Sequence, residues 1–599
     1  MADTPDNPTP PIPLTDTANS TAPGKLPIGE RLAHWRETFR DRLAHVDSLP
    51  QLTVLGLLTG ILAGLIIIAF RLLIEVPLGL WLPDNFENFE SLDPSMHFYL
   101  PFFGACVIGV VLQFIDKRHH ATGVGHVIDR LQNHQGKMPL GNFTVQFFGG
   151  ATSLLTGQSV GREGPAVHMG AGAGSLLGQW MRLPTNSLRP LAGCGVAAAI
   201  AACFNTPMAG VIFAMEVVVM EYSIAGFIPV ILAAVAGTTL SHMVFGNVIN
   251  FAPITGEING FLEFPLIVLA GFFIALLAAL YIRLQAFWCR LSLNRPVALR
   301  FAFAGLITGC AAFYFPDILG IGYDTIERTL SGEQGFWLLL GIVAAKLIVT
   351  SAVLGVGMPG GVIGPLLFLG ACAGGAIGAL AHTLMPASAS PIGFYVVLGM
   401  GAMMGATLNA PLASMIAIIE LTYNPGIIFP SMIVVVIACL TTRWAFRCDG
   451  LFETLLKIQG KFRTPEIAEQ LLSKTGTRQL LDRRIKTCPA QVSFADASAL
   501  LAHHPHWLVL EGNKYILPGQ DLAAFLAQQG DGKKPELINL MEIPARRLDI
   551  IPLADDSTLF EALQSLDAAQ VEAGFISTSQ AQVAGIITRE KINNYYRLK

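Results

Sequence analysis

The stretch Gly161-Arg162-Glu163-Gly164-Pro165 places a carboxylate inside one of the most apolar parts of the chain. The segments on either side of it, 143–159 and 166–180, are expected to be membrane-buried helices. A carboxylate at the centre of a membrane helix costs about 2.5–3.5 kcal/mol on insertion scales. Broken backbone at membrane depth is tolerated only where it is buried in protein or lines a cavity. Glu163 is therefore a candidate functional residue, and the alternative is a paired structural carboxylate.

The composition of the whole chain is that of an integral membrane protein. Of its 599 residues, 52% are hydrophobic and only 13% are charged, whereas soluble domains average about 25% charged residues. The small net charge of −4 implies no nucleic-acid partner. The nine cysteines show no metal-binding spacing and no disulfide pattern, so we expect small core residues and no metal site. No nucleophile–base constellation is visible, so we expect no enzyme.

The N-terminal region is polar. Residues 1–29 are rich in Pro, Thr and Ser, which predicts a disordered tail and not a signal peptide. Residues 30–46 are amphipathic, and we expect them to lie along the inner membrane surface. Their arginines, among them Arg31, Arg36 and Arg40, favour a cytoplasmic N-terminus.

Apolar segments follow one another closely between residues 52 and 446. A membrane-spanning helix needs about 20 residues. Clear long segments are 52–73, 98–114, 226–242, 264–284, 298–315 and 336–354. Other segments are shorter and rich in glycine, which predicts half-helices that meet inside the membrane: 164–180, 191–204, 207–220, 361–380, 396–408 and 411–421.

The short segments contain a repeat. Gly164-Pro165 followed by Gly170 matches Gly364-Pro365 followed by Gly370, an offset of 200 residues. Corresponding broken segments in two membrane halves point to a midplane binding site.

A second match occurs in the same order. Asn205-Thr206-Pro207 followed by Glu216 corresponds to Asn409-Ala410-Pro411 followed by Glu420, an offset of 204 residues. We expect Glu216 and Glu420 to be structural carboxylates satisfied by backbone amides rather than proton carriers. The two matches together indicate that two halves share one plan.

The C-terminal region, residues 465–599, is mixed and soluble-looking in composition. It contains a repeat of its own, because residues 495–500 resemble residues 554–559. Each copy is expected to begin a helix with Asp and Ser in capping positions. A strand–turn–strand pattern and a second helix then follow in each copy. The pattern predicts two β-α-β-β-α units, at about 475–530 and 540–599.

Helices that break inside a membrane can bind anions. Their N-terminal amides have no partner within the helix, and the helix dipole favours negative charge there. Suitable breaks occur at residues 122–125, 161–165 and 357–365. Glu163 could compete with a small anion for such a site, which predicts a gate sensitive to pH and anion concentration. The alternative is that these glycines only allow close helix packing.

Residues 161–165 and 360–365, the paired Asn-x-Pro segments and the tandem C-terminal units together resemble the CLC family of chloride channels and proton/chloride antiporters. The resemblance covers about residues 52–599. It implies a mainly α-helical, multi-pass membrane domain at residues 30–460 with two inverted-topology halves. It also implies a homodimer with one pore per subunit and a cytoplasmic α/β pair of CBS domains at residues 465–599.

The resemblance also implies roles for individual residues. Glu163 is the expected gating glutamate. The amides of Arg162, Glu163 and Gly164 are expected to form an outer anion site. The expected central site comprises the amides of Val362 and Ile363, the hydroxyl of Thr122 and the ring of Phe452.

Three of these positions depart from the family pattern. Thr122 stands where the family usually has serine, and Ile363 stands where it has phenylalanine. Phe452 replaces the usual tyrosine, so one hydroxyl donor is missing. That loss is expected to weaken the central site by about 0.5–1.5 kcal/mol, the net contribution of one hydrogen bond.

The proton path shows the most consequential departure. Antiporters of this family usually have a second glutamate near the inner face, where this chain has Val217 after Glu216. Valine cannot carry a proton, and Glu221, one helical turn further, is the candidate substitute. The sequence therefore favours passive, channel-like chloride conduction gated by Glu163. Proton-coupled chloride exchange is the alternative, with water bridging the gap.

The CBS pair of this family often binds adenine nucleotides. Asp521 in the first unit and Thr588 in the second match parts of the ribose-binding signature, but each site is incomplete. A nucleotide-sensing regulatory protein is therefore a further alternative, and dimer stabilisation is the favoured role of the pair. We expect chloride and the lipid bilayer as partners and no bound cofactor. We expect a bacterial inner or plasma membrane location with both termini cytoplasmic.

Overall fold

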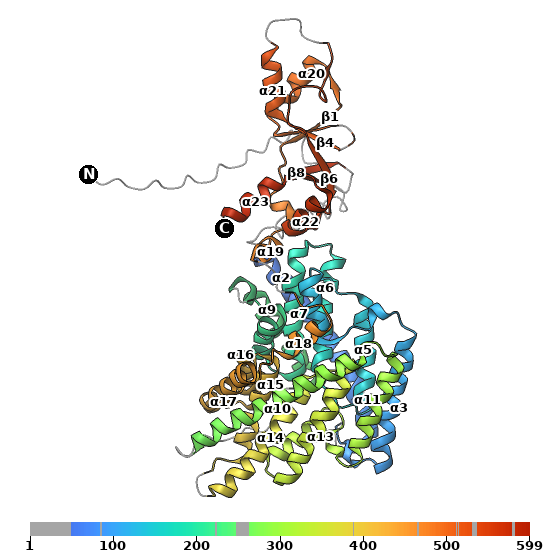
Figure 1. The fold of residues 1–599 in the computed structure, drawn as a ribbon, viewed down its shortest axis with the longest axis vertical. Coiled ribbons are helices and arrows are strands. Elements are labelled where there is room, and N and C mark those ends of the chain that lie inside the picture. Colours follow the sequence, from blue (N-terminus) through green and yellow to red (C-terminus); the bar gives the residue numbers. More distant parts are fainter. Residues whose placement is uncertain are drawn as a thin grey trace, which may run out of the picture.

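The computed structural model describes residues 49–83, 87–221, 224–246, 263–386, 389–463, 467–510, 512, 514–529, 536–577 and 582–598. The tail predicted at 1–29 and the surface helix predicted at 30–46 lie outside the described residues. The described chain forms a large helical membrane domain and a smaller α/β unit at its C-terminal end (Figure 1).

The long apolar segments form long helices, because a continuous apolar run satisfies its backbone groups only within a helix when lipid surrounds it. Eight helices among the described residues are long and apolar enough to cross a membrane. Five of them match long predicted segments: α2 (Leu49–Trp81), α3 (Pro94–Gln113), α9 (Ile224–Phe245), α10 (Glu263–Ser292) and α13 (Phe336–Gly355). The sixth long predicted segment forms the shorter apolar helix α11 (Val297–Ala312).

The short glycine-rich segments form six helices, and two of them, Thr185–Phe204 and Ile363–Leu384, are longer than predicted and long enough to cross a membrane. The six helices are α6 (Glu163–Trp180), α7 (Thr185–Phe204), α8 (Pro207–Phe213), α14 (Ile363–Leu384), α15 (Ile392–Leu408) and α16 (Pro411–Thr422). The remaining helices of the domain are α4 (Gly123–Asn133), α5 (Leu140–Leu155), α12 (Tyr323–Leu330), α17 (Ile428–Leu440) and α18 (Leu451–Ile458). Short turns of helix also occur at η1 (Phe89–Ser91), η2 (Lys117–His119), η4 (Pro316–Ile318) and η5 (Pro425–Ile427).

The predicted repeat is present in the packing of these short helices. A Cβ atom on Gly170 of α6 would collide with the carbonyl of Gly195 on α7. In the second half, a Cβ atom on Gly370 of α14 would collide with the carbonyl of Gly399 on α15. The glycines therefore allow one close helix–helix crossing in each half.

The two halves run in opposite directions. We call the face that carries the C-terminal unit the inner face and the opposite one the outer face. The α6 helix ends beside the C-terminal unit, whereas α14 ends at the far side of the domain (Figure 1). Both helices begin near the middle of the domain, so their N-termini approach each other from opposite sides.

Glu216 and Glu420 join the two halves reciprocally. Glu420 on α16 accepts hydrogen bonds from the amides of Met208 and Ala209 at the start of α8. Glu216 accepts hydrogen bonds from the amides of Leu412 and Ala413 at the start of α16. Each carboxylate thus satisfies the N-terminus of the equivalent helix in the other half, and the prediction of structural carboxylates is confirmed.

The C-terminal unit consists of the two predicted β-α-β-β-α repeats. Their strands join in one six-stranded sheet with the order β1-β3-β4-β6-β7-β8. The strands are β1 (Ile485–Cys488), β3 (Trp507–Leu510), β4 (Tyr515–Pro518), β6 (Leu548–Leu553), β7 (Ala573–Ser577) and β8 (Val583–Thr588), and β2 (Gln491–Val492) pairs with β5 (Ile538–Asn539). The helices are α19 (Ile467–Ser473), α20 (Phe494–Leu501), η7 (Thr477–Gln479), α21 (Gly519–Gln528), α22 (Leu559–Ala569) and α23 (Arg589–Leu598).

The predicted capping positions in these repeats were wrong. Ser493 caps α20 by accepting from the amide of Asp496, and Thr558 caps α22 by accepting from the amide of Glu561. Asp555 instead forms an ion pair with Arg478. An N-cap side chain must reach the amide two or three residues on, and the predicted Asp and Ser lie at other positions relative to the first helical turn.

The C-terminal unit contacts the inner face of the membrane domain. The amide and hydroxyl of Thr185, at the start of α7, both donate to the carbonyl of Asp556 over 2.9 Å. The same hydroxyl lies 2.9 Å from Glu561 Oε2. These bonds tie the second repeat to the loop between α6 and α7.

Candidate anion pathway

Glu163 is the first residue of α6 and is fully buried. Its Oε1 accepts a hydrogen bond of 2.7 Å from the hydroxyl of Tyr323, the first residue of α12. Its Oε2 accepts a hydrogen bond of 3.0 Å from the amide of Gly364 at the start of α14. The carboxylate therefore occupies the N-terminus of the opposing half-helix, where the dipole and free amides favour an anion.

The two breaks are bonded directly to each other. Gly161 and Gly361 exchange backbone hydrogen bonds of 2.7 Å in both directions. A Cβ atom on Gly161 would collide with Glu163 Oε2, and one on Gly361 would collide with the amide nitrogen of Gly164. Glycine is thus required at these positions so that the halves can meet around the carboxylate.

A cavity of about 290 Å³ lies on the inner side of Glu163. It is lined by Thr122, Val362 and Phe452, three of the residues predicted for the central site, and by Gly164. The Thr122 hydroxyl makes no hydrogen bond to cap α4, so it is not committed to that helix.

Two residues at the start of α14, Ile363 and Gly364, lie beside the predicted central site. The side chain of Ile363 lies with Phe204 and Leu367 in a separate apolar space and does not line the inner cavity. The amide that holds the Glu163 carboxylate belongs to Gly364, the residue that follows Val362 and Ile363, whose amides are predicted to bind the anion.

The inner cavity also has basic walls that the sequence did not reveal. Arg300 and Lys461 line it, and Lys461 lies 3.3 Å from Asp129. The Nε of Arg300 has no hydrogen-bond partner among the described residues. Positive charge around a cavity with low-dielectric walls raises the local anion concentration. Arg300 and Lys461 lie far from Glu163 in the sequence, so no local pattern indicated that they share a cavity.

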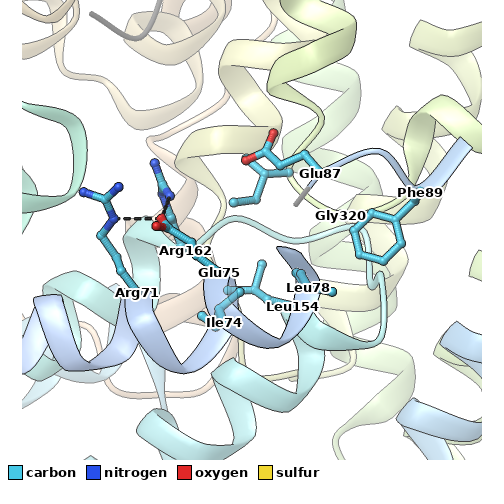
Figure 2. Close-up of a pocket in the computed structure, with 10 residues that line it drawn as sticks. Arg71, Ile74, Glu75, Leu78, Glu87, Phe89, Leu154, Arg162 and Gly320 are labelled. Carbon is cyan, nitrogen blue, oxygen red and sulfur yellow. Dashed lines mark hydrogen bonds and ion pairs between the residues drawn. The ribbon is translucent and has the colours of Figure 1, made fainter. Parts of the chain in front are cut away.

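On the outer side of Glu163 lies a small cavity of about 20 Å³ (Figure 2). Arg162 lines it and forms a 2.9 Å ion pair with Glu75 on α2. Glu75 also pairs with Arg71 over 2.8 Å. Arg162 thus lines the outer cavity and Gly164 lines the inner one, so Glu163 stands between the two.

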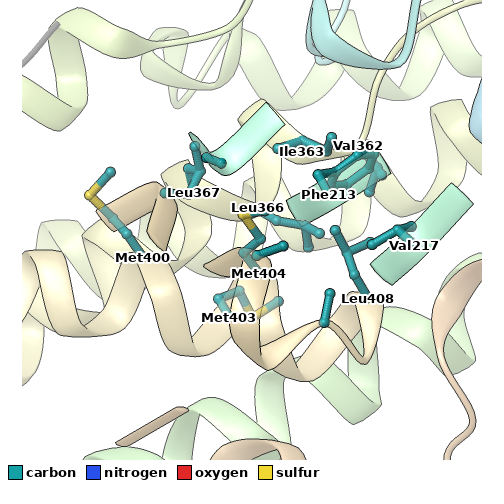
Figure 3. Packing of buried hydrophobic residues seen from close by; sticks show 14 of the residues in the cluster. Phe213, Val217, Val362, Ile363, Leu366, Leu367, Met400, Met403, Met404 and Leu408 are labelled. Carbon is teal, nitrogen blue, oxygen red and sulfur yellow. The ribbon is translucent and has the colours of Figure 1, made fainter. Parts of the chain in front are cut away.

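The position of the missing inner glutamate is apolar. Val217 is buried in one cluster with Phe213 and Leu408 (Figure 3). It lies on the π-helix η3 (Ala214–Val219).

The expectation that Glu221 lies one helical turn beyond Val217 was wrong. The helix ends at Val219, and Met220 adopts a left-handed conformation with φ 56°. Glu221 therefore leaves the helix face of Val217. It forms a 2.7 Å ion pair with Lys474 of the C-terminal unit.

Two further polar residues of the membrane core have partners. Lys346 donates to the carbonyls of Ile318 and Gly320 over 2.9 and 3.1 Å, so it neither pairs with a carboxylate nor reaches the surface. His168 is fully buried and lies 2.9 Å from His126, which lines the inner cavity. The two histidines are 42 positions apart, so no local sequence pattern links them.

The nucleotide-signature residues form local bonds. Asp521 accepts from the amide of Arg546 over 2.9 Å, and Thr588 accepts from the amide of Lys591 over 3.3 Å. Among the described residues, no group of three or more His, Cys, Asp or Glu side chains could hold a metal ion.

Comparisons with known proteins agree with this geometry. The family model described as voltage gated chloride channel matches residues 103–443. A ClcB-like chloride channel protein of Ralstonia nicotianae is 30% identical over 404 residues, covering 65% of this chain and 92% of the relative. The H⁺/Cl⁻ exchange transporter ClcA of Vibrio cholerae is 28% identical over 404 residues, covering 63% of this chain and 83% of the relative.

Solved structures have the same fold. A slow cyanobacterial Cl⁻/H⁺ antiporter aligns with a TM-score of 0.59 at 20% identity, covering 70% of this chain and 98% of that chain. A CLC-type fluoride/proton antiporter aligns with a TM-score of 0.57 at 23% identity, covering 66% of this chain and 96% of that chain. A eukaryotic CLC transporter covers 90% of this chain and 97% of its own, with a TM-score of 0.55 at 19% identity.

Proposed function

This chain belongs to the voltage-gated chloride channel family, and on that premise we propose that it exchanges chloride for protons, with Glu163 as the gate. It is a multi-pass membrane protein of a family that transports anions. Val217 favoured passive conduction when the sequence was considered alone. The similarity to H⁺/Cl⁻ exchange transporters supports the alternative better.

The observation that carries the proposal is the position of Glu163 between the outer and inner cavities. Both of its oxygens accept hydrogen bonds, from Tyr323 and from the Gly364 amide. A protonated carboxyl loses acceptor capacity and its attraction to a helix N-terminus. Protonation therefore releases the side chain from a site that a chloride ion then occupies, which couples the two ions.

The inner cavity supplies a proton route that does not need a glutamate at Val217. It reaches from Lys461 and Gln459 near the inner face to Gly164 beside the gate. A cavity of about 290 Å³ is large enough for several water molecules, since a water occupies about 30 Å³ in the liquid. Protons would thus reach Glu163 through water, along the same space as the anion.

The other residues take the roles expected from the family. Thr122 and Phe452 border the inner anion position, and the first-turn amides of α6 and α14 coordinate the anion. We propose a homodimer, supported by exposed apolar residues such as Met208, Leu412 and Met432 on the face formed by α8, α16 and α17. We propose a bacterial plasma membrane location with the inner face cytoplasmic.

Simultaneous recording of chloride and proton flux tests the proposed exchange. Liposomes containing the purified protein would hold an outward chloride gradient at equal pH, with the voltage clamped near zero by potassium and valinomycin. We expect chloride efflux to drive proton uptake, seen as alkalinisation of the external solution. Chloride efflux without proton uptake would overturn the exchange proposal in favour of passive conduction.

A matched variant separates coupling from leakage in this assay. Glu163→Gln cannot carry a proton at this position but keeps a side chain of similar shape. We expect this variant to pass chloride without proton uptake. Proton uptake that persists in the variant would exclude Glu163 as the carrier.

A further inference from the structure

Glu87 is a buried acid that the exchange mechanism does not yet use. It lies between the end of α2 and η1 on the outer side, and it is only 7% exposed. Its Oε2 accepts a 2.9 Å hydrogen bond from the amide of Tyr323. Its Oε1 is buried and has no partner among the described residues, although a buried carboxylate oxygen normally accepts at least one hydrogen bond.

A buried donor faces the same space. Arg162 is 5% exposed, and its Nε has no partner among the described residues. Glu87 and Arg162 both line the outer cavity (Figure 2). A cavity of about 20 Å³ has room for one water molecule. One water there can donate to Glu87 Oε1 and accept from Arg162 Nε, which satisfies both atoms.

Tyr323 connects this acid to the gate. Its backbone amide donates to Glu87, and its side-chain hydroxyl donates to Glu163. The guanidinium of Arg162 lies 5.4 Å from the centre of the Tyr323 ring. Glu87 therefore holds the start of α12 in the position from which Tyr323 reaches Glu163.

The surroundings of Glu87 make its charge sensitive to pH near neutrality. Burial raises the pKa of Glu87 to about 7, against the opposing effects of Arg162 and the Tyr323 amide. The negative charges of Asp324 and Glu163 also raise this pKa. Arg71 and Glu75 on α2 line the same cavity. Lys346 on α13 interacts electrostatically with Glu87.

We propose that Glu87 is a positioning residue for the gate, and that its charge state, set by the outer solution, controls how firmly Tyr323 holds Glu163. This proposal rests on the proposed role of Glu163 as the gate. A charged carboxylate makes a hydrogen bond about twice as strong as a neutral group, so ionised Glu87 keeps Tyr323 on Glu163. Protonated Glu87 loosens that hold and removes a negative charge beside the anion entrance. Acid on the outer side thus speeds anion entry.

Chloride efflux from liposomes tests this role. The external pH is varied from 5.5 to 8.5 at fixed internal pH. A one-sided block or label restricts the measurement to transporters whose outer face points outward. In the unmodified protein we expect a rise in rate as external pH falls through about 7. Glu87→Gln imitates the protonated state. We expect it to raise the rate at pH 8 by about 2- to 10-fold, the effect of weakening one charged hydrogen bond. The step near pH 7 should disappear.

Glu327→Gln is the matched control, because Glu327 is an exposed carboxylate on the same helix as Tyr323. We expect it to keep the step near pH 7. Tyr323→Phe is the second test should Glu87→Gln fail to fold, because it keeps the amide bond to Glu87 but removes the hydroxyl from Glu163. It should also raise the rate at pH 8 and flatten the step.

An unchanged external pH profile in Glu87→Gln, or in Tyr323→Phe where only that variant folds, would overturn the proposal. Proton recording in the same liposomes keeps this result distinct from the exchange proposal. If the unmodified protein moves no protons and Glu87→Gln removes the step near pH 7, the role of Glu87 is supported and exchange is refuted. If the unmodified protein exchanges protons and Glu87→Gln keeps the step near pH 7, only the role of Glu87 is refuted.

Discussion

At the scale of single residues, Glu163 has a donor from each of two segments that are far apart in the chain. Tyr323 lies 160 positions away and Gly364 lies 201 positions away. The sequence identified the carboxylate because a charge in a broken apolar helix is exceptional. It could not identify Tyr323, since a tyrosine between two membrane segments has many ordinary uses.

The first residue-scale prediction concerns Glu163→Gln. A glutamine side chain does not titrate, so anion flux should become largely independent of pH. Chloride efflux from liposomes at a series of symmetric pH values measures this. A steep pH dependence retained in the variant would contradict the gating role.

A second prediction concerns Phe452, which lines the inner cavity opposite the Thr122 segment. Phe452→Tyr restores the hydroxyl donor that the family usually has at this position. We expect chloride to bind about 2- to 10-fold more tightly, the effect of one net hydrogen bond. Calorimetric titration of detergent-solubilised protein with chloride measures the affinity. Phe313→Tyr, at an exposed ring, should leave it unchanged.

At the scale of elements, the glycine pattern predicted the half-helices and their repeat. Local signals suffice for this, because helix breaks and close crossings depend on glycine and proline at fixed positions. Local signals failed at Glu221, where a left-handed Met220 ends the helix. A left-handed methionine is uncommon, and tertiary contacts rather than local preference stabilise it.

The element-scale prediction concerns the reciprocal caps between the halves. Glu420→Gln weakens the hydrogen bonds to the start of α8, and Glu216→Gln does the same at the start of α16. Each should lower the stability of the membrane domain by about 0.5–2 kcal/mol, the range measured for loss of a helix N-cap. Thermal unfolding in detergent measures both variants.

The symmetry of the halves makes these two variants controls for each other. Similar losses in both are expected, and Glu327→Gln should change stability by less than about 0.5 kcal/mol as an exposed substitution. A loss confined to one of the two variants would contradict the reciprocal arrangement.

At the scale of the whole molecule, the C-terminal unit is bonded to the inner end of the membrane core. Thr185 contacts Asp556 and Glu561, and Lys474 pairs with Glu221. Since α7 follows directly from the helix that Glu163 begins, these bonds connect the C-terminal unit to the gate helix. The sequence predicted both domains but contained no signal for the surfaces through which they meet.

The whole-molecule prediction concerns Thr185→Val, which removes the hydroxyl bonds to Asp556 and Glu561 but keeps the shape of the side chain. Backbone amides of residues 185 and 556–561 should exchange hydrogen up to about 10-fold faster, because the one hydrogen bond that this hydroxyl donates, shared between the two acceptors, is lost. Hydrogen-exchange mass spectrometry measures this. Thr144→Val, which loses only a local bond to Gly141, should leave those amides unchanged. Unaltered exchange in Thr185→Val would show that the hydroxyl does not hold the two domains together.

The sequence by itself determined the membrane class, the broken helices, the two repeats and the buried carboxylate Glu163 at a break, because apolar length, glycine breaks and a misplaced charge are local properties of the chain. Only the tertiary structure decided that Tyr323 and the Gly364 amide are the donors that hold Glu163, and that Glu87 accepts from the amide of Tyr323. It also decided that Glu216 and Glu420 cap each other's halves. These pairings join residues about 160 to 236 positions apart. The geometry of a hydrogen bond depends on where the folded backbone brings two such residues, and no local pattern records it.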